Sequence, residues 1–173
     1  MSLNKRERFF LVGPMGAGKS TIGKSLALYL GKEFIDLDCE IVKYAHKTIP
    51  EIFSEKGESG FRIEETCALK RTLKKNAIIA TGGGIVVTKE NLGILKQEGV
   101  VIYLYCDVDI QYERTLKDQG RPMINTDDRY KRLSDIFAFR KPIFESIADI
   151  TVDSGKLCVN DCIKEICDKL GKF

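Results

Sequence analysis

The chain has 173 residues, of which 43% are hydrophobic and 31% charged, as is ordinary for one globular domain. Its 28 basic and 25 acidic side chains leave a net charge of +3, too balanced to suggest a nucleic-acid-binding surface. No secretory signal begins the chain, and no segment reaches the about 18 apolar residues that a membrane span needs. We therefore expect a cytoplasmic protein without nucleic-acid or membrane partners, and a monomer because nothing demands a dimer.

Short apolar β runs alternate with helical patterns along the whole chain. Such alternation predicts an α/β fold with a parallel sheet covered by helices on both faces. No repeat or linker divides the sequence, so we expect a single domain over residues 1–173. The expected strands are Phe9–Val12, Phe34–Asp36, Ala77–Ala80, Val100–Tyr105 and Ile150–Val152.

The first run leads into a phosphate-binding loop, because residues 13–20 read Gly-Pro-Met-Gly-Ala-Gly-Lys-Ser and match G-x-x-x-x-G-K-[ST]. The glycines let backbone N–H groups close around phosphate oxygens, and the following helix directs its positive end at the same anion. Lys19 would reach the terminal phosphates, and the Ser20 hydroxyl would bind Mg²⁺. The expected ATP contacts in this loop are Gly16, Ala17, Gly18, Lys19, Ser20 and Thr21.

Two carboxylates stand at the end of the second run. Asp36 and Asp38 would point to one side of an extended backbone, at the strand end where ligands collect in open parallel sheets. One could act on an attacking hydroxyl while the other helps to hold Mg²⁺ through water. Equally, both could be solvated end residues, with Asp38 capping a helix that begins at Cys39.

Two helix starts are marked in the middle of the chain. Thr48-Ile-Pro-Glu51 fits a capping box, and Gly57 would end that helix after scarcely two turns. Asp107 precedes a second helix over about 108–117. The polar stretch 118–128 shows neither period and predicts a surface loop, which in a phosphoryl-transfer enzyme would be a lid.

Glycines and arginines supply the remaining candidate ligands. Gly82-Gly83-Gly84 follows the third run, where close backbone approach would offer N–H donors to a ligand, although a flexible turn also fits. Arg62, Arg121 and Arg140 could each grip a flat anion with two parallel hydrogen bonds. Taken singly, each arginine could equally be a surface ion-pair partner.

Together these motifs resemble the shikimate kinase family, in the family's order and near its spacing, over residues 8 to about 153. The resemblance rests on Gly13–Thr21, Asp36-Leu-Asp38, Gly60-Phe61-Arg62, Gly82-Gly83-Gly84, Arg121-Pro122 and Arg140-Lys-Pro-Ile-Phe144. It implies a P-loop, nucleoside-monophosphate-kinase-like fold with a five-stranded parallel sheet in the order 2-3-1-4-5. It also implies ATP-dependent phosphorylation of the shikimate 3-hydroxyl, in the pathway to chorismate and aromatic amino acids, with Mg²⁺ as cofactor.

The resemblance assigns roles residue by residue. On the acceptor side, Asp38 would contact the substrate hydroxyls and orient or deprotonate the nucleophile, and Arg62 and Arg140 would clamp the carboxylate. Backbone Gly82, Gly83 and Gly84, with Phe53 and Phe61 as apolar walls, complete that pocket, within a substrate-binding segment at about 37–65. On the nucleotide side, Arg121 would approach the ATP phosphates from the lid and Arg114 would stack on adenine. Catalysis would rest on Lys19, Asp38 and Arg121, and the metal on Ser20 and, through water, Asp36.

Two features depart from the common pattern. The adenine loop near Asp153-Ser-Gly-Lys156 has no arginine or proline where some relatives place one. No Asp precedes the glycine run, because Ala80 stands there, so Asp36 would have to serve the metal. Two alternatives stay open: a small kinase for another hydroxy acid, such as gluconate, and a nucleotide-binding regulatory module without catalysis.

The six cysteines lack metal-binding spacing and are expected to be reduced core thiols, with Cys158 and Cys162 in a last helix. The single histidine, His46, lies in a polar stretch and is expected in a loop or at a helix end.

Overall fold

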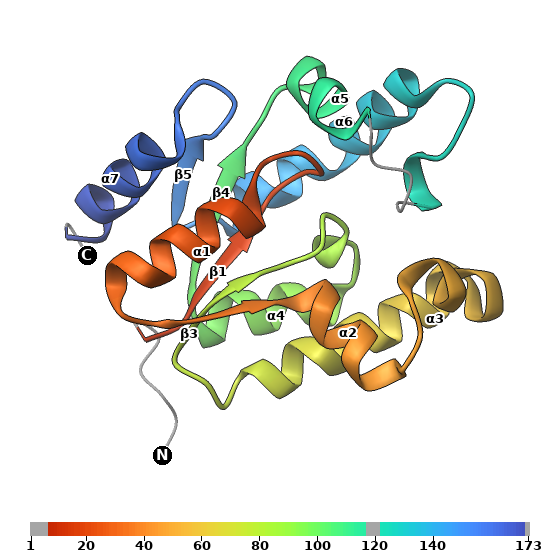
Figure 1. Ribbon diagram of the computed structural model, residues 1–173, viewed down its shortest axis with the longest axis horizontal. Helices are drawn as coiled ribbons and strands as arrows, with labels where there is room; N and C mark the ends of the chain where they lie inside the picture. Colours follow the sequence, from red (N-terminus) through yellow and green to blue (C-terminus); the bar gives the residue numbers. More distant parts are fainter. Residues whose placement is uncertain (1–6, 117–121, 172–173) are drawn as a thin grey trace.

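The computed structural model describes residues 7–116 and 122–171 and is built on one parallel sheet (Figure 1). Its strand order is β2-β3-β1-β4-β5, as the sequence resemblance implies. The strands are β1 (Phe9–Val12), β2 (Glu33–Asp36), β3 (Ala77–Ala80), β4 (Val100–Tyr105) and β5 (Ile150–Asp153). The helices are α1 (Lys19–Leu30), α2 (Leu37–Ala45), α3 (Ile49–Thr72), α4 (Lys89–Glu98), α5 (Val108–Thr115), α6 (Arg129–Ile147) and α7 (Val159–Leu170), with short 3₁₀ turns η2 (Ile85–Val87) and η3 (Pro122–Ile124).

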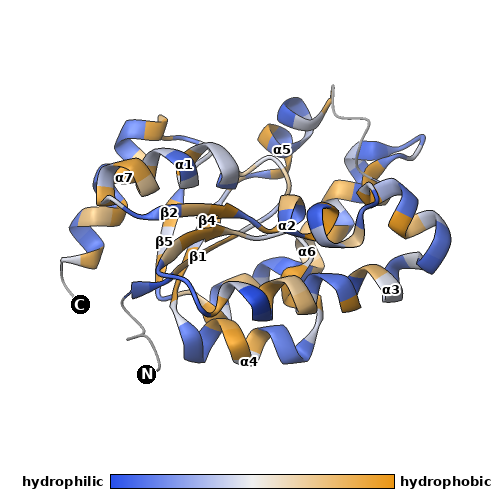
Figure 2. Cartoon of the chain, turned by 60° about the horizontal axis from the view of Figure 1, so that its bottom comes forward, coloured by the Kyte–Doolittle hydropathy of each residue, from blue (hydrophilic) through white to orange (hydrophobic). Residues whose placement is uncertain are grey.

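The central strands β1, β3 and β4 are buried on both faces, because helices cover both sides of the sheet and successive residues of a strand point to opposite sides. Phe10 and Val12 of β1 pack into one apolar cluster, and Phe9 and Leu11 pack into the other. Helices α1 and α7 cover one face of the apolar strands and α4 lies on the other, as Figure 2 shows. All four residues of β1 are buried, which explains why its sequence is a continuous apolar run.

The predicted strands are confirmed, with β2 and β5 each one residue longer than expected. The fifth helix covers Val108–Thr115, and the expected end at residue 117 lies outside the described residues. His46 ends α2 in the left-handed region at φ 53°, in agreement with the expected helix-end position.

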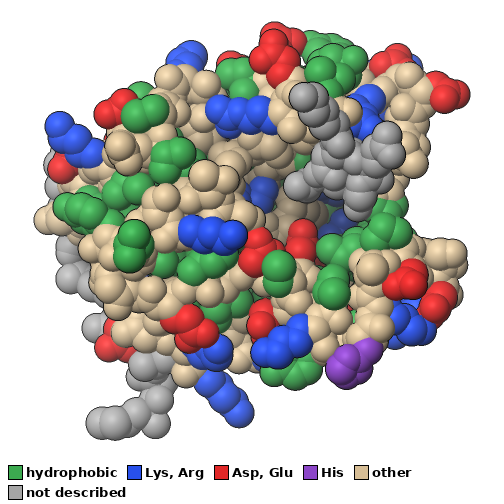
Figure 3. All heavy atoms as spheres, in the orientation of Figure 1, with side chains coloured by type: hydrophobic (Ala, Val, Ile, Leu, Met, Phe, Trp, Pro, Cys, Tyr) green, Lys and Arg blue, Asp and Glu red, His purple; other side chains and the backbone are tan. Residues whose placement is uncertain are grey.

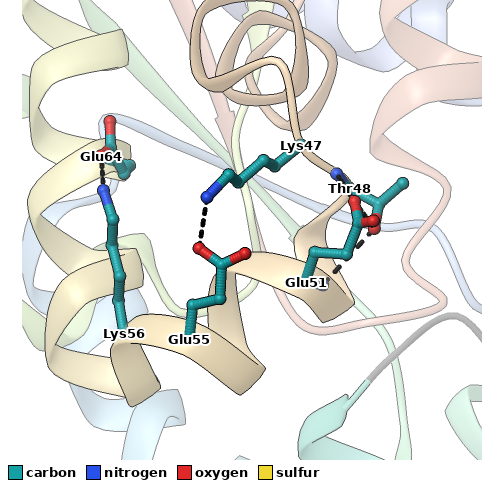
Figure 4. Close-up of polar contacts among 6 residues, drawn as sticks. All are labelled: Lys47, Thr48, Glu51, Glu55, Lys56 and Glu64. Carbon is teal, nitrogen blue, oxygen red and sulfur yellow. Dashed lines mark hydrogen bonds and ion pairs between the residues drawn. The ribbon is translucent and has the colours of Figure 1, made fainter.

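The prediction that a helix ends at Gly57 is partly wrong. The capping box forms, since Thr48 N donates to Glu51 Oε2 at 2.7 Å and Glu51 N donates to Thr48 Oγ1 at 3.4 Å (Figure 4). Gly57 breaks the helical conformation at φ 67°, ψ −173°, but the chain resumes as a helix on the far side. Lys56 pairs with Glu64 at 2.8 Å across this break, so Gly57 makes a kink in α3 and not an end.

Candidate active site

The phosphate-binding loop is shaped by glycines in conformations that other residues rarely adopt. Gly13, Gly16 and Gly18 have φ values of 147°, 80° and 80°. A side chain on Gly13 would also lie 2.4 Å from the Leu104 carbonyl oxygen, so the loop lies directly against β4. Lys19 opens α1 and donates to the Gly13 and Pro14 carbonyl oxygens at 2.9 and 2.7 Å. The loop borders a cavity of about 280 Å³, which we call the phosphate pocket; Gly16, Gly18, Lys19, Ser20 and Thr21 line it.

The second strand brings an acidic pair to this pocket. Asp36 pairs with Ala80 at the ends of β2 and β3, next to Thr81 and Gly82. Ser20 Oγ donates to Asp36 Oδ2 at 2.6 Å, while Asp36 Oδ1 accepts from the N–H groups of Asp38 and Cys39 at 3.1 and 3.4 Å. The extended-backbone argument for Asp36 and Asp38 is therefore wrong. Asp36 caps α2, Asp38 lies in its first turn, and both still line the phosphate pocket because the helix begins at the strand end.

A second cavity of about 280 Å³, the arginine pocket, adjoins the first. Arg140 of α6 is 6% exposed, and its Nη1 donates to the Gly83 carbonyl oxygen at 3.1 Å. Arg62 of α3 pairs with Glu65 at 2.8 Å and with Glu58 at 3.1 Å. Basic and acidic side chains gather in a hollow on this face of the molecule, as Figure 3 shows. The lining residues are Met15, Asp38, Ile49, Phe53, Phe61, Arg62, Glu65, Gly82, Gly83, Gly84, Pro122, Met123 and Arg140.

The charges in the arginine pocket shift one another's protonation. Burial, reinforced by the like charge of Arg62, lowers the pKa of Arg140 to about 10, so Arg140 stays protonated at neutral pH. Burial also acts to lower the pKa of Arg62, but Glu65 and Glu58 outweigh it and raise that pKa. For Glu65, burial raises the pKa against the opposing charge of Arg62, and Asp38 raises it further. An anion between the two arginines would offset their repulsion.

Two glycines of the run, Gly82 and Gly84, are needed for the space they leave. A Cβ on Gly82 would lie 2.8 Å from Glu65 Oε1, and one on Gly84 would lie 2.3 Å from Arg62 Nη2. Neither glycine has a positive φ, so conformational freedom is not what these positions require. The carbonyl oxygens of Gly82 and Gly84 accept hydrogen bonds from the N–H groups of Ile85 and Val87, respectively, as the chain turns into η2. Any larger residue would displace the ionic groups of the arginine pocket.

The two pockets meet at Asp38, Gly82 and Gly83, which line both. One pocket is bordered by the phosphate-binding loop. The other presents the buried Arg140 and the half-buried Arg62, with apolar walls from Phe53 and Phe61, whose ring centroids are 4.7 Å apart. The carboxylate of Asp38 thus stands between a phosphate-binding loop and a second anion site. This arrangement suits transfer of a phosphoryl group to a hydroxylated organic acid.

Comparison with known proteins decides the family. The family model described as Shikimate kinase matches residues 15–171. The chain belongs to the shikimate kinase family. A shikimate kinase from Bordetella avium (strain 197N) is 43% identical over 165 residues, covering 95% of this chain and 79% of the relative. A solved structure of shikimate kinase from Acinetobacter baumannii in complex with shikimate has a TM-score of 0.92 at 39% identity, covering 95% of this chain and 93% of that one.

The gluconokinase alternative is related only at the level of the fold. A gluconokinase structure from Sinorhizobium meliloti 1021 has a TM-score of 0.67 and 16% identity, covering 98% of this chain and 94% of that one. This likeness reflects a shared P-loop architecture, since the family model and the closer relatives all belong to shikimate kinase. Neither this alternative nor the non-catalytic regulatory module is favoured.

The structure brings together most of the residues that the shikimate kinase resemblance selected. The expected acceptor-side residues all line the arginine pocket. Arg114 lines the phosphate pocket, and its Nη1 donates to the Gly16 carbonyl oxygen at 2.9 Å. Ala17, within the loop, is buried, and it is not among the residues that line that pocket. Arg121 lies outside the described residues, whereas Pro122 and Met123, which follow it in the expected lid, line the arginine pocket.

Sequence reasoning missed the acidic partners of Arg62. Glu58, Arg62 and Glu65 have helical i, i+4 and i, i+3 spacing, which would have suggested these pairs if the helix had been continued past Gly57. Glu65 is fully buried, and its Oε1, like Arg62 Nε, has no hydrogen-bond partner among the described residues. Glu65 therefore belongs to the wall of the arginine pocket and holds Arg62 in place.

The cysteines are free, but the expectation that they are core thiols is only partly met. Cys106 and Cys162 are buried and Cys167 is half-buried, whereas Cys39, Cys67 and Cys158 are exposed. Cys158 caps α7 through its sulfur, which accepts from Asp161 N, and so does not lie within the helix. Among the described residues no group of three or more His, Cys, Asp or Glu side chains could hold a metal ion. In that same part of the chain no helix is long and apolar enough to cross a membrane.

Proposed function

We propose that this chain transfers the terminal phosphoryl group of ATP to the 3-hydroxyl of shikimate, and that the transfer takes place where its two pockets meet. The observation that carries the proposal is the position of Asp38, which lines both the phosphate pocket and the arginine pocket. Membership in the shikimate kinase family supports the choice of substrates. The product belongs to the pathway toward chorismate and aromatic amino acids.

The nucleotide side would be bound by the loop and by three cationic groups. Backbone N–H groups of the loop would hold the phosphates, and Lys19 would leave the Gly13 and Pro14 carbonyls to reach the terminal phosphate. Arg121, expected in the lid, would stabilise charge on the migrating group. A positioned cation of this kind contributes about 10³- to 10⁵-fold in rate in phosphoryl transfer. Arg114 would lie beside adenine.

On the acceptor side, the arginines would bind the carboxylate of shikimate. Arg62 and Arg140 present flat guanidinium groups that bind a carboxylate with paired hydrogen bonds, and both are largely buried, which strengthens the interaction. The rings of Phe53 and Phe61 would pack on the carbon ring. A carboxylate held there leaves the hydroxyl groups to face Asp38, which would orient the attacking oxygen or accept its proton.

The oxygen ligands at the start of α1 fit Mg²⁺. Ser20 Oγ and Asp36 Oδ2 lie 2.6 Å apart beside the loop, and hydroxyl and carboxylate oxygens are the ligands that Mg²⁺ prefers. Mg²⁺ bound with a nucleotide takes most of its other ligands from phosphate and water. Ser20 would bind the ion directly and Asp36 through water. When bound, it would neutralise charge on the phosphates.

The same proposal includes the wider organisation of the chain. We place the substrate-binding segment at about 37–65, because α2 and the start of α3 border the arginine pocket. The lid at about 118–128, the single domain over 1–173, the monomeric state and the cytoplasmic location remain predictions.

One coupled assay tests the function. Purified protein with ATP and Mg²⁺ should release ADP at a rate that rises at least 100-fold on adding shikimate, with one equivalent of shikimate 3-phosphate formed per ADP. Gluconate should leave the rate at its background value. ADP release with gluconate but not with shikimate would replace the proposal with a gluconate kinase, and nucleotide binding with no acceptor-dependent release would favour a regulatory module.

A further inference from the structure

The loop after β5 holds one buried hydroxyl that faces the phosphate-binding loop. Ser154 is 2% exposed, and its Oγ lies 2.8 Å from the Ala17 carbonyl oxygen and 2.9 Å from the Tyr105 carbonyl oxygen. A serine hydroxyl has one proton and donates to one acceptor at a time. The Tyr105 carbonyl already accepts the Ser154 N–H at 2.9 Å, so Ala17 is the acceptor that depends on the hydroxyl.

A hydrogen bond to the Ala17 carbonyl affects the next N–H group. The carbonyl of Ala17 and the N–H of Gly18 belong to one planar trans peptide, in which the two groups point in opposite directions. A donor that holds the carbonyl on the side of Ser154 therefore turns the Gly18 N–H to the other side. Gly18 lines the phosphate pocket, at the amino-terminal end of α1.

The loop that carries Ser154 is itself well braced. Asp153 Oδ1 accepts from the N–H groups of Gly155 and Lys156 at 3.1 and 3.2 Å, which closes a tight turn around Ser154. Arg114 bridges the same two loops, since its Nη2 donates to the Ser154 carbonyl oxygen at 3.1 Å and its Nη1 to the Gly16 carbonyl oxygen at 2.9 Å. Two consecutive carbonyls of the phosphate-binding loop are thus held from outside.

We propose that Ser154 is a positioning residue for nucleotide binding, which orients the Gly18 N–H toward the phosphates through its bond to the Ala17 carbonyl. It touches neither phosphate nor acceptor and acts through the peptide. The inference rests on the proposed function, because it needs a nucleotide in the phosphate pocket. This role would also explain how the short loop after β5 contributes to nucleotide binding although it lacks the arginine or proline found in some relatives.

The test measures nucleotide affinity by isothermal titration calorimetry. Ser154→Ala removes the hydroxyl and keeps the fold of the turn, and the dissociation constant of ADP should rise about 3- to 10-fold, as expected for one lost hydrogen bond. The dissociation constant of AMP should change less than twofold, because AMP lacks the phosphate groups that the loop binds beyond the first. The KM for shikimate should also change less than twofold. Ser154→Cys introduces a weaker donor of similar size, so its dissociation constant for ADP should lie between those of the parent protein and Ser154→Ala.

Two further measurements separate positioning from general stability. Thr72 is a matched control, because it is also 2% exposed and its hydroxyl donates to the Leu69 carbonyl oxygen at 2.7 Å, far along α3. Thr72→Val should lower the melting temperature as Ser154→Ala does while leaving ADP affinity unchanged. The inference would be overturned if Ser154→Ala weakened the binding of AMP and ADP equally. It would also be overturned if both Ser154 variants bound ADP within twofold of the parent affinity. If the parent protein bound no ADP, the proposed function itself would fail.

Discussion

At the residue scale, the position of Asp38 between two pockets makes it the side chain on which transfer depends most. Asn has the same size but neither the charge nor the basicity to orient or deprotonate a hydroxyl. We expect Asp38→Asn to lower kcat by about 10²- to 10⁴-fold, while the dissociation constants of ADP and shikimate change little. Steady-state kinetics measures kcat, and calorimetry measures the two dissociation constants. Asp135→Asn, at an exposed site on α6, should be silent, and unchanged turnover in Asp38→Asn would remove the assigned role of that carboxylate.

Arg140 is the second residue whose chemistry can be tested by a small change. Lysine keeps the positive charge but cannot form two parallel hydrogen bonds to a carboxylate. We expect Arg140→Lys to raise the KM for shikimate by about 10- to 100-fold, because one hydrogen bond between charged groups is lost. The effect on kcat should be smaller. Arg71→Lys, where the arginine stacks on Tyr44 outside the pocket, serves as the control. A KM that stays at the parent value would count against the carboxylate clamp.

At the element scale, the kink in α3 is what allows one helix to border the arginine pocket twice. Ile49 and Phe53 lie before Gly57, and Phe61, Arg62 and Glu65 lie after it, yet all line the same pocket. The break requires a φ of 67° with a ψ of −173°, a conformation that is essentially open only to glycine. Space is not the constraint, because a Cβ on Gly57 would have no atom within 4 Å.

This backbone requirement predicts opposite effects at two glycines. Gly57→Ala should lower the free energy of unfolding by about 1–3 kcal/mol, because alanine is strained at that φ and ψ. Gly93 also has no atom within 4 Å of an added Cβ but lies inside α4, so Gly93→Ala should raise the free energy of unfolding by up to about 1 kcal/mol. Urea titrations of the two variants give both values. Changes of the same sign would show that the kink conformation does not decide the outcome.

At the scale of the whole molecule, the reaction rates of the cysteine thiols test the burial pattern. Cys67 and Cys158 are exposed and should react first with iodoacetamide at pH 8. Cys39 is also exposed, but partial burial and then the charges of Asp36 and Asp38 raise its pKa, so its thiolate fraction and its rate should be lower.

Two buried thiols should react only when the sheet opens. Burial raises the pKa of Cys106 to about 11, and Cys162 is equally inaccessible because it lies on the buried face of α7. Mass spectrometry of the native protein should show both thiols unmodified after the exposed thiols have reacted completely with iodoacetamide. In urea, all six cysteines should be modified. Reaction of Cys106 at the rate of Cys67 would mean that the phosphate-binding loop does not pack on β4 as described.

How far the sequence predicts this protein differs between its parts. The strands, the phosphate-binding loop and the capping box follow from local patterns, because short-range sterics and hydrophobic periodicity act within a few residues. The sheet order and most acceptor-side residues came from motifs that resemble shikimate kinase. The helical continuation past Gly57 was missed because a glycine with these torsions marks either an end or a kink, and only packing distinguishes them.

The sequence by itself determined which groups the chain offers: a glycine-rich loop with Lys19 and Ser20, two aspartates, and a set of arginines. Only the tertiary structure decided which of them share a space, because Arg62, Gly83 and Arg140 are far apart along the chain and meet only after the strands have paired. It also decided that Gly82 and Gly84 are needed for the room they leave, that Glu65 holds Arg62, and that Ser154 reaches Ala17. Such contacts depend on long-range packing, which no local pattern encodes.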